Sequence, residues 1–387
     1  MEGSPTKEGP TSVASAKSSV PSSSLSFRNM HRVFTASRTA LKSFSSYADL
    51  IRSSPPPSSS FYAMTSSLLH PPAHLPPTVA LQLSQQAPIL LQSTPSSISP
   101  YSLSSLWSAA ESPELWMTYE NLMLSCLRTG DEESAHLCLE RLTARFGAEN
   151  ERLMALRGLF QEAISDDDAA LKQVLEEYEA ILKKDSSNIP VTKRRIALLK
   201  SLKKTPEAIT ALNQFLDSSP TDAEAWAELA DLYASQGMYQ QSIFGLEEVL
   251  LITPYAWNIH ARLGEILYMA AISGEAGAEK YLAESLRRFC RSIELCDDYL
   301  RGYYGLKLTT GRLLTGVPQA SRQAKSDSVL AAPDSKTVER LNETATAKLT
   351  EIVRLSTRGD AAWGGYDKAE LIAAKALLDT DTVKTTR

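Results

Sequence analysis

Residues 221–254 read TDAEAWAELADLYASQGMYQQSIFGLEEVLLITP. The large apolar residues of the first half are three or four positions apart and would share one helix face: Trp226, Leu229 and Tyr233. Ala230 and Ser242 are small residues at positions where two consecutive helices would cross, and small side chains let helices approach closely. Pro254 then ends the second helix, because proline cannot continue the helical hydrogen-bond pattern. The stretch therefore predicts one helix–turn–helix unit.

The unit recurs with a period of 34 residues. Pro220 lies 34 residues before Pro254, and the same interval separates Ala208 from Ser242. This is the period of the tetratricopeptide repeat (TPR), whose W-x-x-L-G-x-x-Y signature residues 226–233 closely match. Further copies span about residues 116–149, 151–188 and 189–222, and a fifth begins at Trp257. Five units exceed the roughly three that a solenoid needs, so the sequence predicts an all-α TPR solenoid, a right-handed superhelix of helix–turn–helix repeats.

Capping signals fall at the boundaries that this period sets. Ser112-Pro113 and Thr205-Pro206 each place a capping side chain before a proline in the first helical turn. Thr221-Asp222-Ala223-Glu224 reads as a capping box at the start of the next unit. Two units are lengthened, one near residues 166–168 and the other near residues 272–279. We interpret the acidic run Asp166-Asp167-Asp168 as a solvated loop rather than a cation site.

Composition divides the chain into three parts. Residues 1–110 are rich in Ser and Pro, and residues 53–110 contain no Asp, Glu, Lys or Arg. Such a composition buries too little apolar surface to offset chain entropy, so we predict a largely disordered extension over residues 1–110. Residues 111–300 are predicted to form the TPR superhelix of about five repeats. Residues 301–387 are predicted to form C-terminal capping helices with a loop near residues 316–335.

The C-terminal part should cover the apolar face of the last repeat, because a solenoid needs such a cap. One helix is predicted over residues 299–314. Helical spacing of apolar residues predicts two more, over residues 337–355 and 360–378. The last of these places four apolar residues on one face: Trp363, Ala369, Ile372 and Leu377.

Composition also excludes several function classes. The chain carries 40 basic and 45 acidic residues, which argues against a nucleic-acid surface of clustered Lys and Arg. No apolar run approaches the roughly 20 residues that span a bilayer, so any membrane contact is expected to be indirect. The 5 His and 4 Cys residues are not at zinc-ligand spacings. Phosphate-loop and nucleophile-elbow motifs are absent as well. We therefore expect no catalytic, metal-binding or cofactor-binding residues, and reduced cysteines.

One basic segment stands apart from the repeats. Between Phe27 and Ile51, apolar residues fall near one helical face and are interrupted by Arg and Lys, with Asp49 as the only acid. An amphipathic, Arg- and Ser-rich, acid-poor segment is typical of a mitochondrial presequence. A membrane-surface helix, or an extension upstream of a start at Met64, are the alternatives. Whether residues 1–63 belong to the functional protein stays open.

Several short runs carry a more specific likeness than the repeat pattern alone: Trp116-x-x-Tyr119-Glu120, Cys138-Leu139-Glu140-x-Leu142, Lys193-Arg194-Arg195-Ile196-Ala197, Glu207-Ala208-Ile209-x-x-Leu212-Asn213 and Glu224-Ala225-Trp226. With these runs in this order, the segment from Trp116 to Leu306 resembles subunit 2 of the endoplasmic-reticulum (ER) membrane protein complex. The resemblance covers about half of the chain. It does not reach residues 1–100 and is weak beyond Thr315.

The resemblance implies a non-catalytic, peripheral subunit on the cytosolic face of the ER membrane. It implies that the TPR curve holds cytosolic segments of the membrane-embedded subunits and a second soluble subunit. It also implies that the complex inserts transmembrane helices, including tail anchors, into the bilayer. No cofactor and no nucleic-acid partner are implied. The residues alone predict a helical groove suited to an extended peptide or a helix.

TPR grooves are lined by repeat positions 2, 5, 6 and 9 of the first helices. Applied to three repeats, this rule gives the candidate partner-binding residues Lys193, Arg194, Glu224, Glu228, Asp231, Asn258, Arg262 and Glu265. Their signs are mixed, with an acidic middle. A solvated surface is the simpler alternative for any one of them, because exposed ion pairs contribute only about 0–1 kcal/mol.

Two further function classes remain as alternatives. A co-chaperone that grips a C-terminal carboxylate uses a Lys-Asn-Asn-Lys-Arg clamp, and Lys193 and Arg262 occupy two of its places. Ala197 and Asn258 miss two others, and Glu228 would repel the carboxylate of the ligand. A mitochondrial TPR protein, directed by residues 27–51, is the third hypothesis. Purification from detergent-solubilised membranes would separate the three by what co-purifies.

Overall fold

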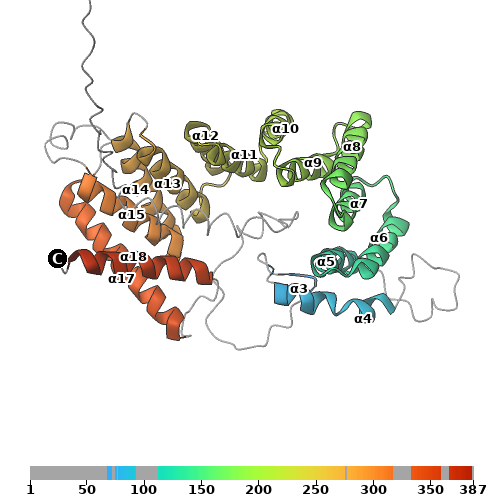
Figure 1. Cartoon of the computed structure of the whole chain (residues 1–387), viewed down its shortest axis with the longest axis horizontal. Helices are drawn as coiled ribbons and strands as arrows, with labels where there is room; N and C mark the ends of the chain where they lie inside the picture. The colour runs from blue at the N-terminus through green and yellow to red at the C-terminus, as the bar shows by residue number, and fades with distance from the viewer. Residues whose placement is uncertain are drawn as a thin grey trace, which may run out of the picture.

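The computed structural model describes residues 68–71, 75, 77–92, 112–274, 277–316, 333–358 and 366–385. All regular secondary structure in these ranges is α-helical, which confirms the predicted all-α repeat fold. The helix pairs of the repeats are α5 (Pro113–Thr129) and α6 (Glu132–Phe146), α7 (Glu151–Ile164) and α8 (Asp168–Lys184), α9 (Ile189–Ser201) and α10 (Thr205–Ser218), α11 (Ala223–Ser235) and α12 (Tyr239–Ile252), and α13 (Trp257–Ile272) and α14 (Ala278–Leu295). Figure 1 shows these pairs following one another along an arc, with the first helix of each pair on the inner side.

Side-chain caps set the helix starts close to the predicted positions. Ser112 accepts a hydrogen bond from the backbone N–H of Leu115 at 3.2 Å, as a capping serine should. Asp167, within the predicted acidic loop, caps α8 in the same way. The capping box predicted from Thr221 is displaced by one residue, because Asp222 is the residue that caps α11. Thr205 likewise lies inside α10, one residue after the cap position.

The repeats pack through small residues at helix crossings. A Cβ atom added at Gly158 on α7 would lie 2.2 Å from the ring of Tyr178 on α8. Ser242 and Ala230, the small residues of the quoted stretch, are both buried. Continuous clusters of buried apolar residues then run from one repeat to the next along the arc. The core is therefore a stripe that follows the solenoid rather than one central mass.

Two helices lie within the span predicted to be largely disordered: α3 (Pro77–Ser84) and α4 (Ala87–Gln92). Leu83 on α3 and Ala87 at the start of α4 are fully buried against the first repeat. Arg141 on α6 donates hydrogen bonds to the Leu91 carbonyl at 2.7 Å and to the Tyr119 hydroxyl at 2.6 Å. Residues 77–92 are therefore an ordered exception within the extension predicted to be largely disordered, because this charge-free stretch supplies apolar surface that packs on the first repeat.

Trp226, the first large apolar residue of the quoted stretch, is half-buried. Its indole N–H donates to the Pro220 carbonyl at 2.8 Å, and its ring packs edge-on against Phe244 with centroids 5.9 Å apart. Phe244 itself is mostly exposed. Trp226 still contacts the clusters of both neighbouring repeats, so it joins them from the edge of the core.

The C-terminal cap consists of α15 (Leu300–Gly316), α17 (Ser335–Arg358) and α18 (Lys368–Thr385), which pack on the last repeat. The last helix begins at Lys368 and not at residue 360, and Trp363 lies outside the described residues, as does most of the predicted loop near 316–335. Ile372 is 70% exposed whereas Leu377 is buried, so the prediction that these two residues share one helix face is wrong. Leu371, Ala374 and Leu377 form the packed face instead.

Candidate partner-binding groove

The first helices α5, α7, α9, α11 and α13 form the inner side of the arc (Figure 1). Ion pairs join each of these helices to the next: Glu120–Arg152, Glu162–Arg194, Lys193–Glu224 and Asp231–Arg262. The partners are 31 or 32 residues apart in the sequence, slightly less than one repeat. The repeat period therefore brings the opposite charges together. We call these four pairs the charge ladder.

Lys193 is held from α11 by two carboxylates. Its Nζ lies 2.7 Å from Asp222 Oδ2 and 2.9 Å from Glu224 Oε2. Burial lowers the pKa of Lys193, but the hydrogen bonds to Asp222 and Glu224 outweigh burial, so its pKa is raised. Nζ also lies over the ring of Phe215, 5.8 Å from the centroid. Lys193 therefore stays protonated and fixes the α9–α11 contact.

Arg194 is buried, although the sequence placed it among the groove residues. Its Nε donates to Glu162 Oε1 at 3.2 Å, and its Nη2 contacts the second oxygen of the same carboxylate. The Tyr178 hydroxyl donates to Glu162 Oε1 at 2.6 Å. Burial, followed by the adjacent Glu162 carboxylate, raises the pKa of Tyr178. This network joins α7, α8 and α9, so Arg194 supports the groove wall.

Arg262 on α13 binds two carboxylates at once. Its Nη2 lies 3.0 Å from Asp231 Oδ1, and its Nη1 lies 2.7 Å from Glu265 Oε2. Glu265 is buried, and its second carboxylate oxygen has no hydrogen-bond partner within the part of the chain that the structure describes. Asp231 is the more exposed member of its pair with Arg262.

The two remaining predicted residues lie on the same inner helices. Glu228 on α11 forms an ion pair with Lys200 on α9. Asn258 is half-buried in the first turn of α13. The acidic side chains predicted for the middle of the groove are therefore largely paired with Lys and Arg. The charge that the groove presents to solvent depends on which member of each pair is the more exposed.

An apolar pocket of about 40 Å³ lies between α5, α7 and α9 at the N-terminal half of the groove. Its lining residues are Glu120, Leu124, Arg152, Ala155, Leu156, Leu159, Pro190 and Arg194. The pocket was not predicted from the sequence, because the groove positions were applied only to the helices now seen as α9, α11 and α13. With Gly158 at repeat position 8, the same rule selects four residues of α7: Arg152, Ala155, Leu156 and Leu159.

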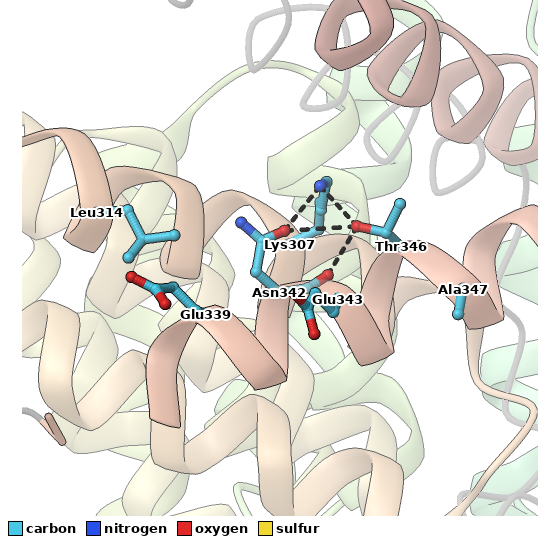
Figure 2. Close-up of a pocket in the computed structure, with 7 residues that line it drawn as sticks. All are labelled: Lys307, Leu314, Glu339, Asn342, Glu343, Thr346 and Ala347. Atoms are coloured by element: carbon cyan, nitrogen blue, oxygen red, sulfur yellow. Dashed lines mark hydrogen bonds between the residues drawn. The ribbon is translucent and has the colours of Figure 1, made fainter. Parts of the chain in front are cut away.

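A larger hollow, of about 490 Å³, lies between α15 and α17 (Figure 2). Lys307 on α15 is buried there, and its Nζ donates to Asn342 Oδ1 at 2.7 Å and to Thr346 Oγ1 at 2.6 Å. Glu339 and Glu343 of α17 complete the lining. Because the lysine is satisfied by α17, these contacts join the first two helices of the cap, α15 and α17.

The same ranges of the chain hold no helix long and apolar enough to cross a bilayer. They also hold no group of three or more His, Cys, Asp or Glu side chains placed to bind a metal ion. Cys126 and Cys138 are free and buried, and burial raises the pKa of each thiol to about 12. Neither thiol is activated for chemistry.

Consecutive helix pairs on a 34-residue period define a TPR solenoid, a repeat protein built from stacked helix–turn–helix units. A family model described as the EMC2 TPR-like repeat domain matches residues 136–273. The chain belongs to the family of ER membrane protein complex subunit 2, which confirms the resemblance drawn from the sequence.

Individual relatives agree with this assignment. The chain is 35% identical over 201 residues to the TPR repeat protein oca3 of Schizosaccharomyces pombe, covering 52% of this chain and 68% of the relative. It is 32% identical over 216 residues to ER membrane protein complex subunit 2 of Xenopus tropicalis, covering 56% of this chain and 69% of the relative. Among solved structures, it is similar to the C-terminal part of a TPR protein from Cytophaga hutchinsonii, with 13% identity, a TM-score of 0.42, and coverage of 77% of this chain and 99% of that one.

Proposed function

We propose that this chain is a non-catalytic scaffold subunit of the ER membrane protein complex, bound peripherally on the cytosolic face of the ER membrane. In this proposal, its groove holds cytosolic segments of the membrane-embedded subunits and links them to a second soluble subunit. The chain thereby supports the insertion of transmembrane helices, including tail anchors, into the membrane. The partners are other subunits of the complex, and membrane contact is indirect.

The observation that carries this proposal is the charge ladder within the family-matched segment. Residues 136–273 contain three of its four pairs complete: Glu162–Arg194, Lys193–Glu224 and Asp231–Arg262. Ion pairs between consecutive first helices oppose rotation of one repeat against the next, so they favour a groove of fixed curvature. A preformed groove binds a partner segment with a smaller ordering cost than a flexible one.

A carboxylate-clamp co-chaperone is less well supported by the same contacts. Lys193 faces Asp222 and Glu224, and Arg262 faces Asp231 and Glu265. A ligand carboxylate would have to displace carboxylates that are already bound. The mitochondrial alternative rests on residues 27–51, which lie outside the described part of the chain.

The direct test is affinity purification of the tagged full chain from detergent-solubilised membranes. We expect membrane-embedded and soluble subunits of the ER complex to co-purify with it. Recovery of mitochondrial proteins instead, or micromolar binding of an acidic C-terminal peptide with no ER subunit retained, would overturn the scaffold assignment.

Groove charge can be tested with a matched pair of variants. Glu228→Lys alone places a second positive charge beside Lys200, whereas Glu228→Lys with Lys200→Glu restores the ion pair in reversed order. If the partner subunit is recognised through the charge at position 228, both variants should release it. Circular dichroism should show unchanged helicity in the double variant. If only the single variant releases it, repeat packing and not charge is responsible.

A further inference from the structure

The N-terminal half of the groove contains the apolar pocket between α5, α7 and α9. Ala155, Leu156 and Leu159 on α7 line the pocket together with Leu124 on α5 and Pro190 on α9. A volume of about 40 Å³ is room for a few methyl-sized groups, because one water-sized probe needs about 10–15 Å³. The equivalent groove positions of α9, α11 and α13 carry mainly charged residues. A ligand in the groove can therefore place an aliphatic side chain in this pocket.

The more exposed member of each ion pair in the charge ladder is basic at one end of the groove and acidic farther along. Beside the pocket, the Arg152 side chain is 61% exposed and its partner Glu120 only 18%. Farther along, the acid is the more exposed member: Glu224 is 45% exposed against 21% for Lys193. Asp231 is 27% exposed against 14% for Arg262. A ligand therefore meets a guanidinium next to the pocket and carboxylates over α11.

We propose that the groove selects an extended partner segment of a defined polarity: an acidic residue beside Arg152, an aliphatic side chain in the α5–α7–α9 pocket, and basic residues over Glu224 and Asp231. This inference rests on the proposed function, because it describes the chemistry of the segment that the same groove holds. The aliphatic anchor supplies most of the affinity, since a side chain buried in a desolvated pocket dominates binding. The exposed charges fix direction and register and disfavour segments of reversed polarity.

Short synthetic peptides test this chemistry on the full chain. Two peptides each carry an acidic end, one central leucine and a lysine-bearing end; in the first the acidic end is N-terminal, and in the second the ends are reversed. A control peptide for each replaces the leucine with serine. By fluorescence anisotropy, we expect one of the two, called the matching peptide, to bind, and the peptide with reversed ends and the serine control to bind about tenfold or more weakly, equivalent to about 1.4 kcal/mol. Equal binding of all peptides, or no binding of any, would overturn the proposal.

Two variants of the chain locate the binding. Ala155→Leu fills the pocket, and Ala163→Leu, at an exposed position of the same helix, is its control. The exchange Glu120→Arg with Arg152→Glu keeps the ion pair but turns a carboxylate toward solvent. We expect Ala155→Leu to lose the matching peptide about tenfold while Ala163→Leu keeps it. The exchange should shift preference toward the peptide with reversed ends.

Thermal unfolding of each variant separates lost binding from lost folding. If Ala155→Leu unfolds at the native temperature yet binds the matching peptide fully, the pocket assignment is wrong. If Ala155→Leu is destabilised, the proposal is tested with the variant Glu120→Arg, Arg152→Glu instead. If that variant still prefers the matching peptide as the unmodified chain does, the proposal is overturned. A concentration-dependent dimer that Ala155→Leu abolishes would assign the pocket to a second copy of the chain, which also overturns it.

The outcome is distinguishable from failure of the scaffold function. If Ala155→Leu and the ion-pair exchange retain all ER subunits during purification from membranes, and the peptides bind without selectivity, the pocket inference fails and the scaffold function stands. If the unmodified chain retains no ER subunit, the scaffold function fails whatever the peptides do.

Discussion

Replacing Arg194 with methionine should destabilise the solenoid strongly, because the change leaves the Glu162 carboxylate buried without its cation. Both side chains of the pair are largely buried, at 8% exposure for Arg194 and 12% for Glu162. Breaking a buried ion pair by removing one partner costs about 3–5 kcal/mol. We expect the lower end, about 3 kcal/mol, because the Tyr178 hydroxyl still donates to Glu162 at 2.6 Å. For a chain of this size, that corresponds to a fall in melting temperature of about 6 °C.

The control is the double variant Arg194→Met with Glu162→Gln, in which no charge is buried and the amide oxygen still accepts from Tyr178. Its free energy of unfolding should lie within about 1 kcal/mol of that of the unmodified chain, because replacing both members of a buried ion pair by uncharged groups often changes stability little. Urea unfolding followed by circular dichroism measures both variants. A single variant that loses less than about 1 kcal/mol, or a double variant as unstable as the single, would refute the reasoning.

Three further predictions follow from the packing. Gly158→Ala should cost about 1–3 kcal/mol in urea unfolding, because the added Cβ would lie 2.2 Å from Tyr178, and an unchanged midpoint would show that the helices separate freely. Cys126 and Cys138 should resist iodoacetamide at pH 8 until the chain is unfolded, because burial raises the pKa of both thiols to about 12, and mass spectrometry of the labelled native chain checks this. Burial lowers the pKa of His260 below its usual 6.5, so the unfolded chain binds the proton more readily and stability should fall as pH drops through 6.5. His260→Gln should flatten that pH dependence, measured as melting temperature between pH 7.5 and about 5.

The repeat core could be predicted from sequence because its signals are local and periodic. The 34-residue interval, the small residues at helix crossings and caps such as Ser112 each depend on a few neighbouring residues. The helices α3 and α4 could not be predicted in the same way. Their sequence is short, uncharged and flanked by Pro and Ser, and their stability comes from burial of Leu83 and Ala87 against a repeat that follows later in the chain.

The groove was partly predictable. Repeat positions selected residues on the inner helices α9, α11 and α13, but they could not tell which of these residues pair with one another. Exposure of Arg194 depends on Glu162 and Tyr178, which lie outside the groove positions. The pocket residues of α7 occupy the same repeat positions when Gly158 is taken as position 8. They would have been predicted if the position rule had been applied to one more repeat. Ile372 was misplaced because it lies five residues before Leu377, a spacing that puts the two on different sides of an α-helix.

The hydrogen bond from Arg141 to the Leu91 carbonyl has a consequence for biosynthesis. The two residues are 50 positions apart, so α3 and α4 leave the ribosome before the side chain that holds them has been made. At about 5–20 residues per second, the delay is about 2.5–10 s. Helices this short are not stable alone in water, where about 12–15 residues are marginal. Helices α3 and α4 are therefore expected to fold after α5 and α6, and during that interval Leu83 is accessible to chaperones and proteases.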